Sequence, residues 1–181
     1  MNRKEFFATS AKAGLGCCAF ALLGGKAAAA DAPSTVDPEK QFLTGWLTDL
    51  FEAMDTGLDP ETKVKVMAGC GVGCFRRHSF KTDIAKQGKG NLDKLLEVMK
   101  KNFEVWREGD LVHIRFGKEV KQCFCPAARF HPIRDHDMHC ECTRATQQAI
   151  FETALERPIK VEIVESVRRG SKTCHFIAHV A

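Results

Sequence analysis

The chain has 181 residues, of which 27 are Lys or Arg and 23 are Asp or Glu, giving a formal net charge of +4. The first 30 positions hold four basic residues (Arg3, Lys4, Lys12 and Lys26) and one acidic residue (Glu5), so three of the net positive charges lie there. The remaining body is close to neutral and has no basic run interleaved with aromatic residues, which argues against a nucleic-acid partner. Its length of about 150 residues suits a single hydrophobic core.

The segment Met1–Ala30 has the three parts of a cleavable export signal. Asn2–Lys4 is a basic start, Leu15–Leu23 is apolar, and Ala28–Ala30 is a small-residue site that predicts cleavage after Ala30. Arg3–Phe7 resembles the twin-arginine export motif, with Lys in place of the second Arg. A span would need about 20 apolar residues, so we expect no stable membrane span in the mature protein. The segment therefore predicts a periplasmic or otherwise exported bacterial protein.

The N-terminal part of the mature chain is predicted to be helical, after a flexible leader over residues 31–37. Apolar residues recur at steps of three and four from Pro38 to Leu58, which predicts an amphipathic helix whose Phe and Leu residues join the core. Asp59 is a good N-cap for a second helix, which we expect to end near Cys70 because two glycines follow. A third helix is expected to start around Asn91.

The C-terminal part changes period. Alternating apolar and polar residues predict strands over Phe103–Trp106, Leu111–Phe116, Val120–Cys125, Ile159–Val167 and Thr173–Val180, with a helix over Thr143–Leu155. The sequence thus predicts one α+β domain over residues 38–181, with an antiparallel sheet packed against helices. Its expected order is an N-terminal helical part, a meander, a helix and a C-terminal hairpin.

The end of the chain, Glu152–Val180, resembles a known domain. Its segment Pro158–Ser166, the turn at Gly170 and the final Cys174-His175-Phe176 are similar to the end of the 4-vinyl reductase, or hydrocarbon-binding, domain. The related L-2-amino-thiazoline-4-carboxylic acid hydrolase family has a similar ending. The resemblance implies a small-molecule-binding fold, or hydrolysis of a small cyclic C–N bond.

Four cysteines form the strongest candidate site. Cys123-x-Cys125 and Cys140-x-Cys142 stand on either side of a segment that contains His131, His136 and His139. Thiolates and imidazoles are the ligands of zinc, and thiolates hold iron–sulfur clusters. We therefore predict a zinc or iron–sulfur site at Cys123, Cys125, Cys140 and Cys142, with His139 as a possible additional ligand.

Disulfides are the alternative, because an exported protein can meet an oxidising compartment. Of the nine cysteines, Cys17 and Cys18 leave with the predicted signal, so seven remain and cannot all pair within one chain. Free thiols are the third option. The twin-arginine character of the signal favours a cofactor, because that route resembles a system that exports folded proteins.

A second group of residues follows the predicted second helix. Cys70 and Cys74 are candidate nucleophiles or further ligands, and otherwise form a disulfide or two small buried residues. Arg76, Arg77 and Arg129 could bind a small carboxylate, for which a guanidinium offers a planar fork, although each alone is typical of a solvated surface.

Two functions follow. The first is an exported, Cys-rich, metal-binding domain that binds or senses a small molecule or carries electrons. The alternative is an enzyme, a hydrolase similar to the thiazoline-carboxylate family. The sequence leaves the ligand, the metal and the oligomeric state open.

Overall fold

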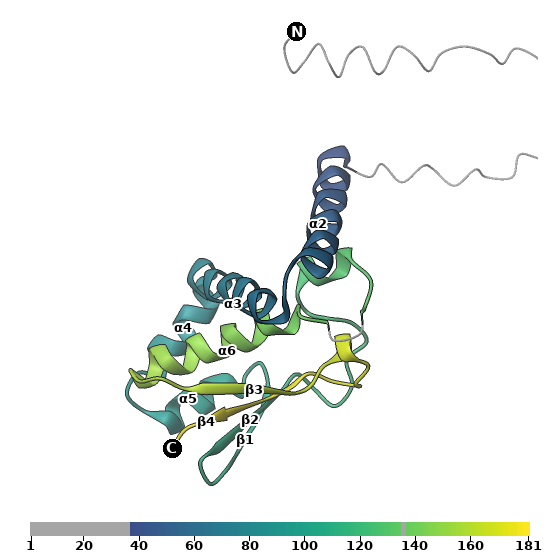
Figure 1. Cartoon of the computed structure of the whole chain (residues 1–181). Helices are drawn as coiled ribbons and strands as arrows, with labels where there is room; N and C mark the ends of the chain where they lie inside the picture. Colours follow the sequence, from purple (N-terminus) through teal and green to yellow (C-terminus); the bar gives the residue numbers. More distant parts are fainter. Residues whose placement is uncertain (1–36, 135–136) are drawn as a thin grey trace, which may run out of the picture. The chain divides into compact units, whose positions relative to one another are not determined.

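The structure is a computed structural model that describes residues 37–134 and 137–181. The described residues belong to one compact unit, Val36–Ala181 (Figure 1). The predicted signal, its cleavage after Ala30, nearly all of the leader and the candidate ligand His136 lie outside the described residues, so these remain predictions. No helix in residues 37–134 or 137–181 is both long and apolar enough to cross a membrane.

Four helices precede the sheet in the described chain and one interrupts it. Their bounds are α2 Pro38–Gly57, α3 Pro60–Arg77, α4 Ser79–Gln87, α5 Leu92–Met99 and α6 Cys140–Leu155. Three begin at a capping side chain, because Asp37, Asp59 and Asn91 accept a hydrogen bond from a backbone N–H in the first turn. The predicted starts of the three N-terminal helices are confirmed, whereas α4 is an additional helix.

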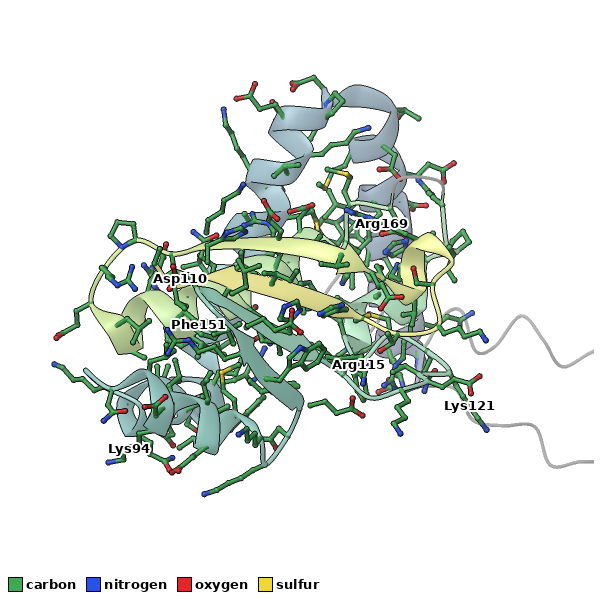
Figure 2. The ribbon with its side chains drawn as sticks, turned by 90° about the horizontal axis from the view of Figure 1, so that it is seen from below. Lys94, Asp110, Arg115, Lys121, Phe151 and Arg169 are labelled. Atoms are coloured by element: carbon green, nitrogen blue, oxygen red, sulfur yellow. The ribbon has the colours of Figure 1, made fainter. Side chains whose placement is uncertain are left out.

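The sheet has four antiparallel strands. They are β1 Glu104–Glu108, β2 Leu111–Arg115, β3 Lys160–Glu165 and β4 His175–His179, in the order β1-β2-β4-β3. Residues on one face of the sheet, such as Val112, Ile114 and Phe176, are buried in the core with residues of α5 and α6. The predicted α+β class, with helices packed on an antiparallel sheet, is confirmed (Figure 2).

The predicted third strand, Val120–Cys125, is wrong. This segment is irregular, and Pro126 starts the short 3-10 helix η1, Pro126–Phe130. Val120 donates a backbone hydrogen bond to the Lys172 carbonyl at 2.9 Å, beside the connection between β3 and β4. Proline cannot donate to a ladder of strand hydrogen bonds, so it diverts the chain here.

Helix α2 was expected to place its apolar residues in the core, and this expectation is wrong. None of its residues is buried, and Phe42, Leu43 and Trp46 are 72%, 57% and 55% exposed. Figure 1 shows α2 apart from the sheet, and among the described elements it packs mainly against η1. The periodicity identified the helix correctly, but periodicity cannot tell whether an apolar face meets its own domain.

Helix α3 does not end at Cys70 but runs through both glycines to Arg77. A Cβ atom on Gly71 would lie 2.2 Å from the Cys142 carbonyl oxygen and 2.9 Å from Ala145 Cβ on α6. The Gly71 carbonyl also accepts a hydrogen bond from Thr146 Oγ1 at 3.0 Å. Gly71 therefore lets the backbones of α3 and α6 meet, which outweighs the low helix propensity of glycine.

We predict that Gly71→Ala lowers the free energy of unfolding by about 2 kcal/mol or more, because the new methyl group overlaps α6 backbone. Gly69→Ala is the matched control, since a Cβ at Gly69 in the same helix meets no atom within 4 Å. That change should be neutral or stabilise by up to about 1 kcal/mol. Urea unfolding followed by circular dichroism measures both, and equal stabilities would contradict the close helix contact.

Candidate ligand-binding site

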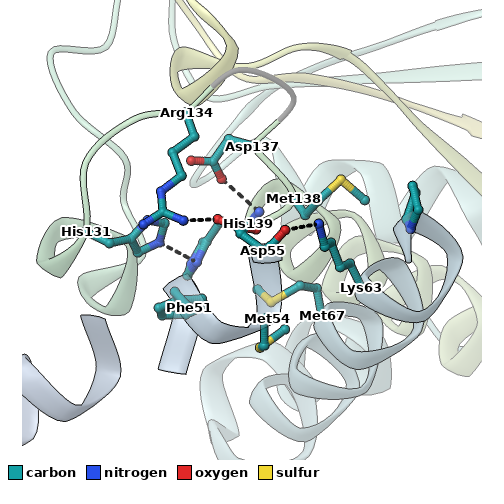
Figure 3. Close-up of a pocket in the computed structure, with 11 residues that line it drawn as sticks. Phe51, Met54, Asp55, Lys63, Met67, His131, Arg134, Asp137, Met138 and His139 are labelled. Atoms are coloured by element: carbon teal, nitrogen blue, oxygen red, sulfur yellow. Dashed lines mark hydrogen bonds and ion pairs between the residues drawn. The ribbon is translucent and has the colours of Figure 1, made fainter. Parts of the chain in front are cut away.

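A cavity of about 270 Å³ lies between α2, α3 and the segment that leads into α6 (Figure 3). Apolar side chains of Phe51, Met54 and Met67 form part of its lining. Its polar lining consists of Asp55, Lys63, His131, Arg134, Asp137 and His139. The cavity thus combines an apolar wall with several hydrogen-bonding groups, as small-molecule sites do.

The buried side chain of Arg168 holds residues before α6 in place, on the side away from the cavity. It belongs to η2, Val167–Arg169, in the connection between β3 and β4, and is only 4% exposed. Its guanidinium forms a buried ion pair with Asp137 at 2.6 Å and donates to the carbonyl oxygens of Ala128 and Pro132 at 2.6 and 2.9 Å. A buried charge is tolerated only with such partners, so these bonds fix the segment against the β3–β4 connection.

The same guanidinium sets the proton positions on two histidines. Arg168 Nη2 lies 2.9 Å from His131 Nδ1, and His131 Nε2 lies 3.4 Å from His139 Nδ1. The same Nη2 lies 3.5 Å from His131 Nε2, so its nearer contact is with Nδ1. A guanidinium only donates, so we assign Nδ1 as the acceptor and place the His131 proton on Nε2. His131 then donates to His139 Nδ1, which places the remaining proton of a neutral His139 on Nε2. His131 Nδ1 also lies 3.2 Å from the Pro132 carbonyl, but a ring nitrogen without a proton cannot donate to it.

His139 Nε2 is buried and has no hydrogen-bond partner among the described residues. The residue is 4% exposed and lines the cavity. Desolvation, followed by the nearby His131 and Arg168, lowers the pKa of His139 to about 4, so the ring is neutral near pH 7. A buried donor without a partner costs about 1–3 kcal/mol, and that cost is relieved when a ligand accepts the bond.

The rim of the cavity is charged. Asp55 at the end of α2 forms an ion pair with Arg134, and Lys63 of α3 donates to the Asp55 backbone carbonyl at 2.8 Å. The ring of Phe51 lies under the imidazoles, with its centroid 4.4 Å from that of His131 and 5.5 Å from that of His139. Helix α2 therefore contributes both an apolar wall and one carboxylate to the site.

The cysteines gather differently from the predicted group of four. Cys140 and Cys142 begin α6, where a separation of two residues turns side chains roughly 200° apart. Burial raises the pKa of Cys142 to about 12, and the nearby Cys125, Cys74 and Cys70 raise it further. We call Cys142 and these three cysteines the first thiol set. Burial also raises the pKa of Cys140 to about 11, with Cys174 and Cys123 adding to it, and these three form the second thiol set.

Metal binding by these residues stays a prediction. All seven described cysteines are free thiols, so the disulfide alternative finds no bond in residues 37–134 and 137–181. Within the same residues, no group of three or more His, Cys, Asp or Glu side chains is placed to hold a metal ion. The candidate ligands Cys140 and Cys142 belong to different thiol sets, whereas Cys125 also raises the pKa of Cys123 and so connects the two sets.

The other predicted residues lie away from the cavity. Cys70 is exposed, and Cys74 is partly buried with Lys81 Nζ at 2.8 Å from its sulfur. Arg76 and Arg77 are exposed at the end of α3 and line neither this cavity nor the next. Arg129 lines a second cavity, of about 320 Å³, together with Cys123 and Arg168.

Two contributors to the site had no assigned role in the sequence. No role was expected for Arg168, and Phe51 was expected to be a core residue of the first helix. Arg168 stands two residues before Gly170 and next to the exposed Arg169. Nothing in the local sequence separates it from the exposed basic residues around it.

We predict that His139 makes the domain less stable in acid. Its folded-state pKa lies below the unfolded value of about 6.5, so the unfolded chain binds the proton first as the pH falls. Stability is therefore retained above about pH 6.5 and lost toward pH 4, by roughly 3 kcal/mol at most. His139→Gln, which cannot titrate, should reduce this loss by about 1 kcal/mol or more in urea unfolding.

The matched control is His78→Gln, because His78 is exposed at the junction of α3 and α4. It shows how much of the effect comes from replacing any histidine, and the pH dependence of His139→Gln is compared with it. An acid-induced loss in His139→Gln as large as that of the unchanged protein would contradict a buried neutral imidazole at this position.

Comparison with known proteins finds one family and several similar solved structures, including the following two. The phenol-responsive sensory domain of the transcription activator PoxR, determined with phenol, is 14% identical, covers 77% of this chain and 73% of its own, and has a TM-score of 0.45. A vinyl-4-reductase family protein from Methanocaldococcus jannaschii is 12% identical, covers 82% of this chain and 85% of its own, and has a TM-score of 0.33. A search of curated proteins finds no match.

The vinyl-4-reductase protein comes from the group that Glu152–Val180 resembles. Identities of 14% or less with TM-scores below 0.5 support no inference about function. The family match is of a different kind, because the family of unknown function DUF6144 matches residues 34–179, well over half of the sequence. The chain therefore belongs to the DUF6144 family.

Proposed function

We propose that this domain binds a small organic molecule in the cavity between α2, α3 and the segment before α6. The observation that carries the proposal is the buried Nε2–H of His139, which lines the cavity without a partner. The chain from Arg168 through His131 holds this donor in one orientation. Because the orientation of this donor is already fixed, little side-chain entropy is lost when a ligand accepts its hydrogen bond.

The lining indicates the chemistry of the ligand. The hydrogen-bond donor at the cavity wall favours a ligand with an acceptor oxygen. The side chains of Phe51, Met54 and Met67 favour a ligand whose remaining part is apolar. Asp137 also lines the cavity, but its charge is balanced by the buried Arg168 behind it. Of the remaining lining charges, Lys63 and Arg134 exceed Asp55 by one, which favours an anion over a cation. We infer a compact molecule that carries a carboxylate or hydroxyl group on an apolar ring or chain.

We predict that benzoate or phenol binds the cavity and that His139→Phe weakens the binding at least about tenfold, because the ring remains but its donor is lost. Isothermal titration calorimetry at about pH 7 measures the affinities. His113→Phe is the matched control, since His113 is also a buried histidine but lies on the opposite face of the sheet, stacked on Trp106. It should leave the affinity within about twofold.

A second substitution separates binding from folding. Met54→Trp should fill part of the cavity from α2, where Met54 is only partly buried, and abolish binding without unfolding the domain. If neither probe binds at millimolar concentration, or if His139→Phe and His113→Phe behave alike, the proposal is wrong.

Metal binding is a second candidate function. The first thiol set is a better candidate for the ligands than the predicted group of four cysteines. Cys70 and Cys74 flank Gly71, which meets the Cys142 backbone directly, so three of its members lie at the crossing of α3 and α6. Thiolates from separate segments are the usual ligands of zinc and iron–sulfur sites. Ligation by three or more of them requires their side chains to turn from their present positions. The hydrolase alternative has no comparable support, because Cys70 and Cys74 do not line the cavity.

We predict that cysteine alkylation distinguishes burial from ligation. With iodoacetamide near neutral pH, the exposed Cys70 should react first, and Cys140 and Cys142 should stay protected because burial raises the pKa of both thiols. Mass spectrometry of the modified peptides measures the order in which the cysteines are alkylated. If a chelator leaves that order unchanged, burial alone protects these thiols. If a chelator exposes Cys142 together with Cys70 and Cys74, and releases zinc or iron, the first thiol set holds a metal.

A further inference from the structure

We propose that the domain forms a dimer in which α2 of each copy docks on α3 of the other. The inference concerns a surface outside the cavity and does not depend on the proposed ligand. Its starting point is that α2, a helix of 20 residues, buries none of its residues. Helices in proteins draw most of their stability from packing an apolar face, so an α2 without such packing lacks its main support.

The unpacked face of α2 is large and apolar. Phe42, Leu43, Trp46 and Leu50 are 72%, 57%, 55% and 38% exposed, and at steps of one, three and four residues they form one stripe. A contiguous exposed stripe with two aromatic residues marks an interaction site rather than the scattered apolar surface of ordinary domains. Tryptophan at the centre of such a stripe is typical of the residues that dominate binding energy.

The charges of the two helices identify the partner surface. Helix α2 carries Glu39, Asp49, Glu52 and Asp55 against Lys40, a net charge of −3. Helix α3 carries Lys63, Lys65, Arg76 and Arg77 against Glu61, a net charge of +3. Asp55 and Lys63 belong to the cavity rim, and Lys65 pairs with Glu61 within α3. Electrostatic complementarity between two copies therefore rests on Asp49 and Glu52 of α2 and on Arg76 and Arg77 of α3.

The exposed face of α3 has room for the large side chains of α2. Val66 is 40% exposed, and Gly69 and Cys70 follow it on the surface at helical spacing. A Cβ atom on Gly69 would meet nothing within 4 Å, so this part of α3 is open. An aromatic residue of a second copy can therefore lie against the α3 backbone, as small residues at helix interfaces allow.

Docking of α2 on a partner's α3 is reciprocal. If α2 of one copy packs on α3 of the second, two-fold symmetry places the second α2 on the first α3 by the same contacts. One contact thus forms twice, and the assembly closes as a dimer. The acidic polar face of α2 also argues against a membrane as the partner, because membrane-bound amphipathic helices are rich in Lys and Arg.

Sedimentation velocity of the full chain tests the proposal. The chain should be dimeric, and Trp46→Glu should raise the dimer dissociation constant by about thirtyfold or more, as loss of a central aromatic contact does. Val164→Glu is the matched control, because Val164 is also an exposed apolar residue, at 50%, but lies on β3. It should leave the dimer intact, and circular dichroism confirms that each variant is folded.

A charge-reversal pair gives the decisive measurement. Asp49→Lys with Glu52→Lys changes α2 from −3 to +1, and Arg76→Glu with Arg77→Glu changes α3 from +3 to −1. Each double variant alone places like charges at both contacts and should be monomeric. An equimolar mixture places opposite charges at both contacts and should dimerise again.

Three results would overturn the proposal. A monomeric full chain on which Trp46→Glu has no effect would mean that the stripe is covered within one copy. A chain that is monomeric in solution but sediments with phosphatidylcholine vesicles would assign α2 to a membrane. A mixture of the two charge variants that stays monomeric would exclude the pairing of α2 with α3.

Discussion

The buried ion pair between Arg168 and Asp137 is the constraint on which the candidate site depends. It joins the connection between β3 and β4 to the segment that leads into α6, two parts of the chain 31 residues apart. Because both side chains are almost fully buried, neither can lose its partner without leaving an uncompensated charge. The fold must therefore hold Asp137 and the residues beside it in place, although residues 131–134 and 137–139 form neither helix nor strand.

That constraint reaches the cavity through hydrogen bonds rather than through packing. Arg168 fixes the proton on His131, His131 orients His139, and the Asp137 carboxylate also accepts from the backbone N–H of His139 at 2.9 Å. The residue that faces the cavity thus has a defined tautomer and position before any ligand arrives. Preorganisation of this kind is what separates a binding site from an incidental gap between helices.

The sequence was a good guide where local rules decide the structure. The cap at Asp59, the start of the third predicted helix near Asn91 and the turn at Gly170 follow from side-chain capping and turn chemistry. It was a poor guide where distant contacts decide. The glycines after Cys70 predict a helix end, but the approach of α6 to Gly71 stabilises a continuous helix instead. Burial of Arg168 depends likewise on carbonyl groups that only the folded chain brings together.

The contact between Gly71 and α6 also determines which walls of the cavity can move. Where two helix backbones touch without side chains between them, sliding or tilting would break direct backbone contacts, so α3 and α6 behave as one rigid body. Helix α2 has no comparable attachment among the described elements. Any change in the width of the cavity must therefore come from displacement of α2, with α3 as the stationary wall.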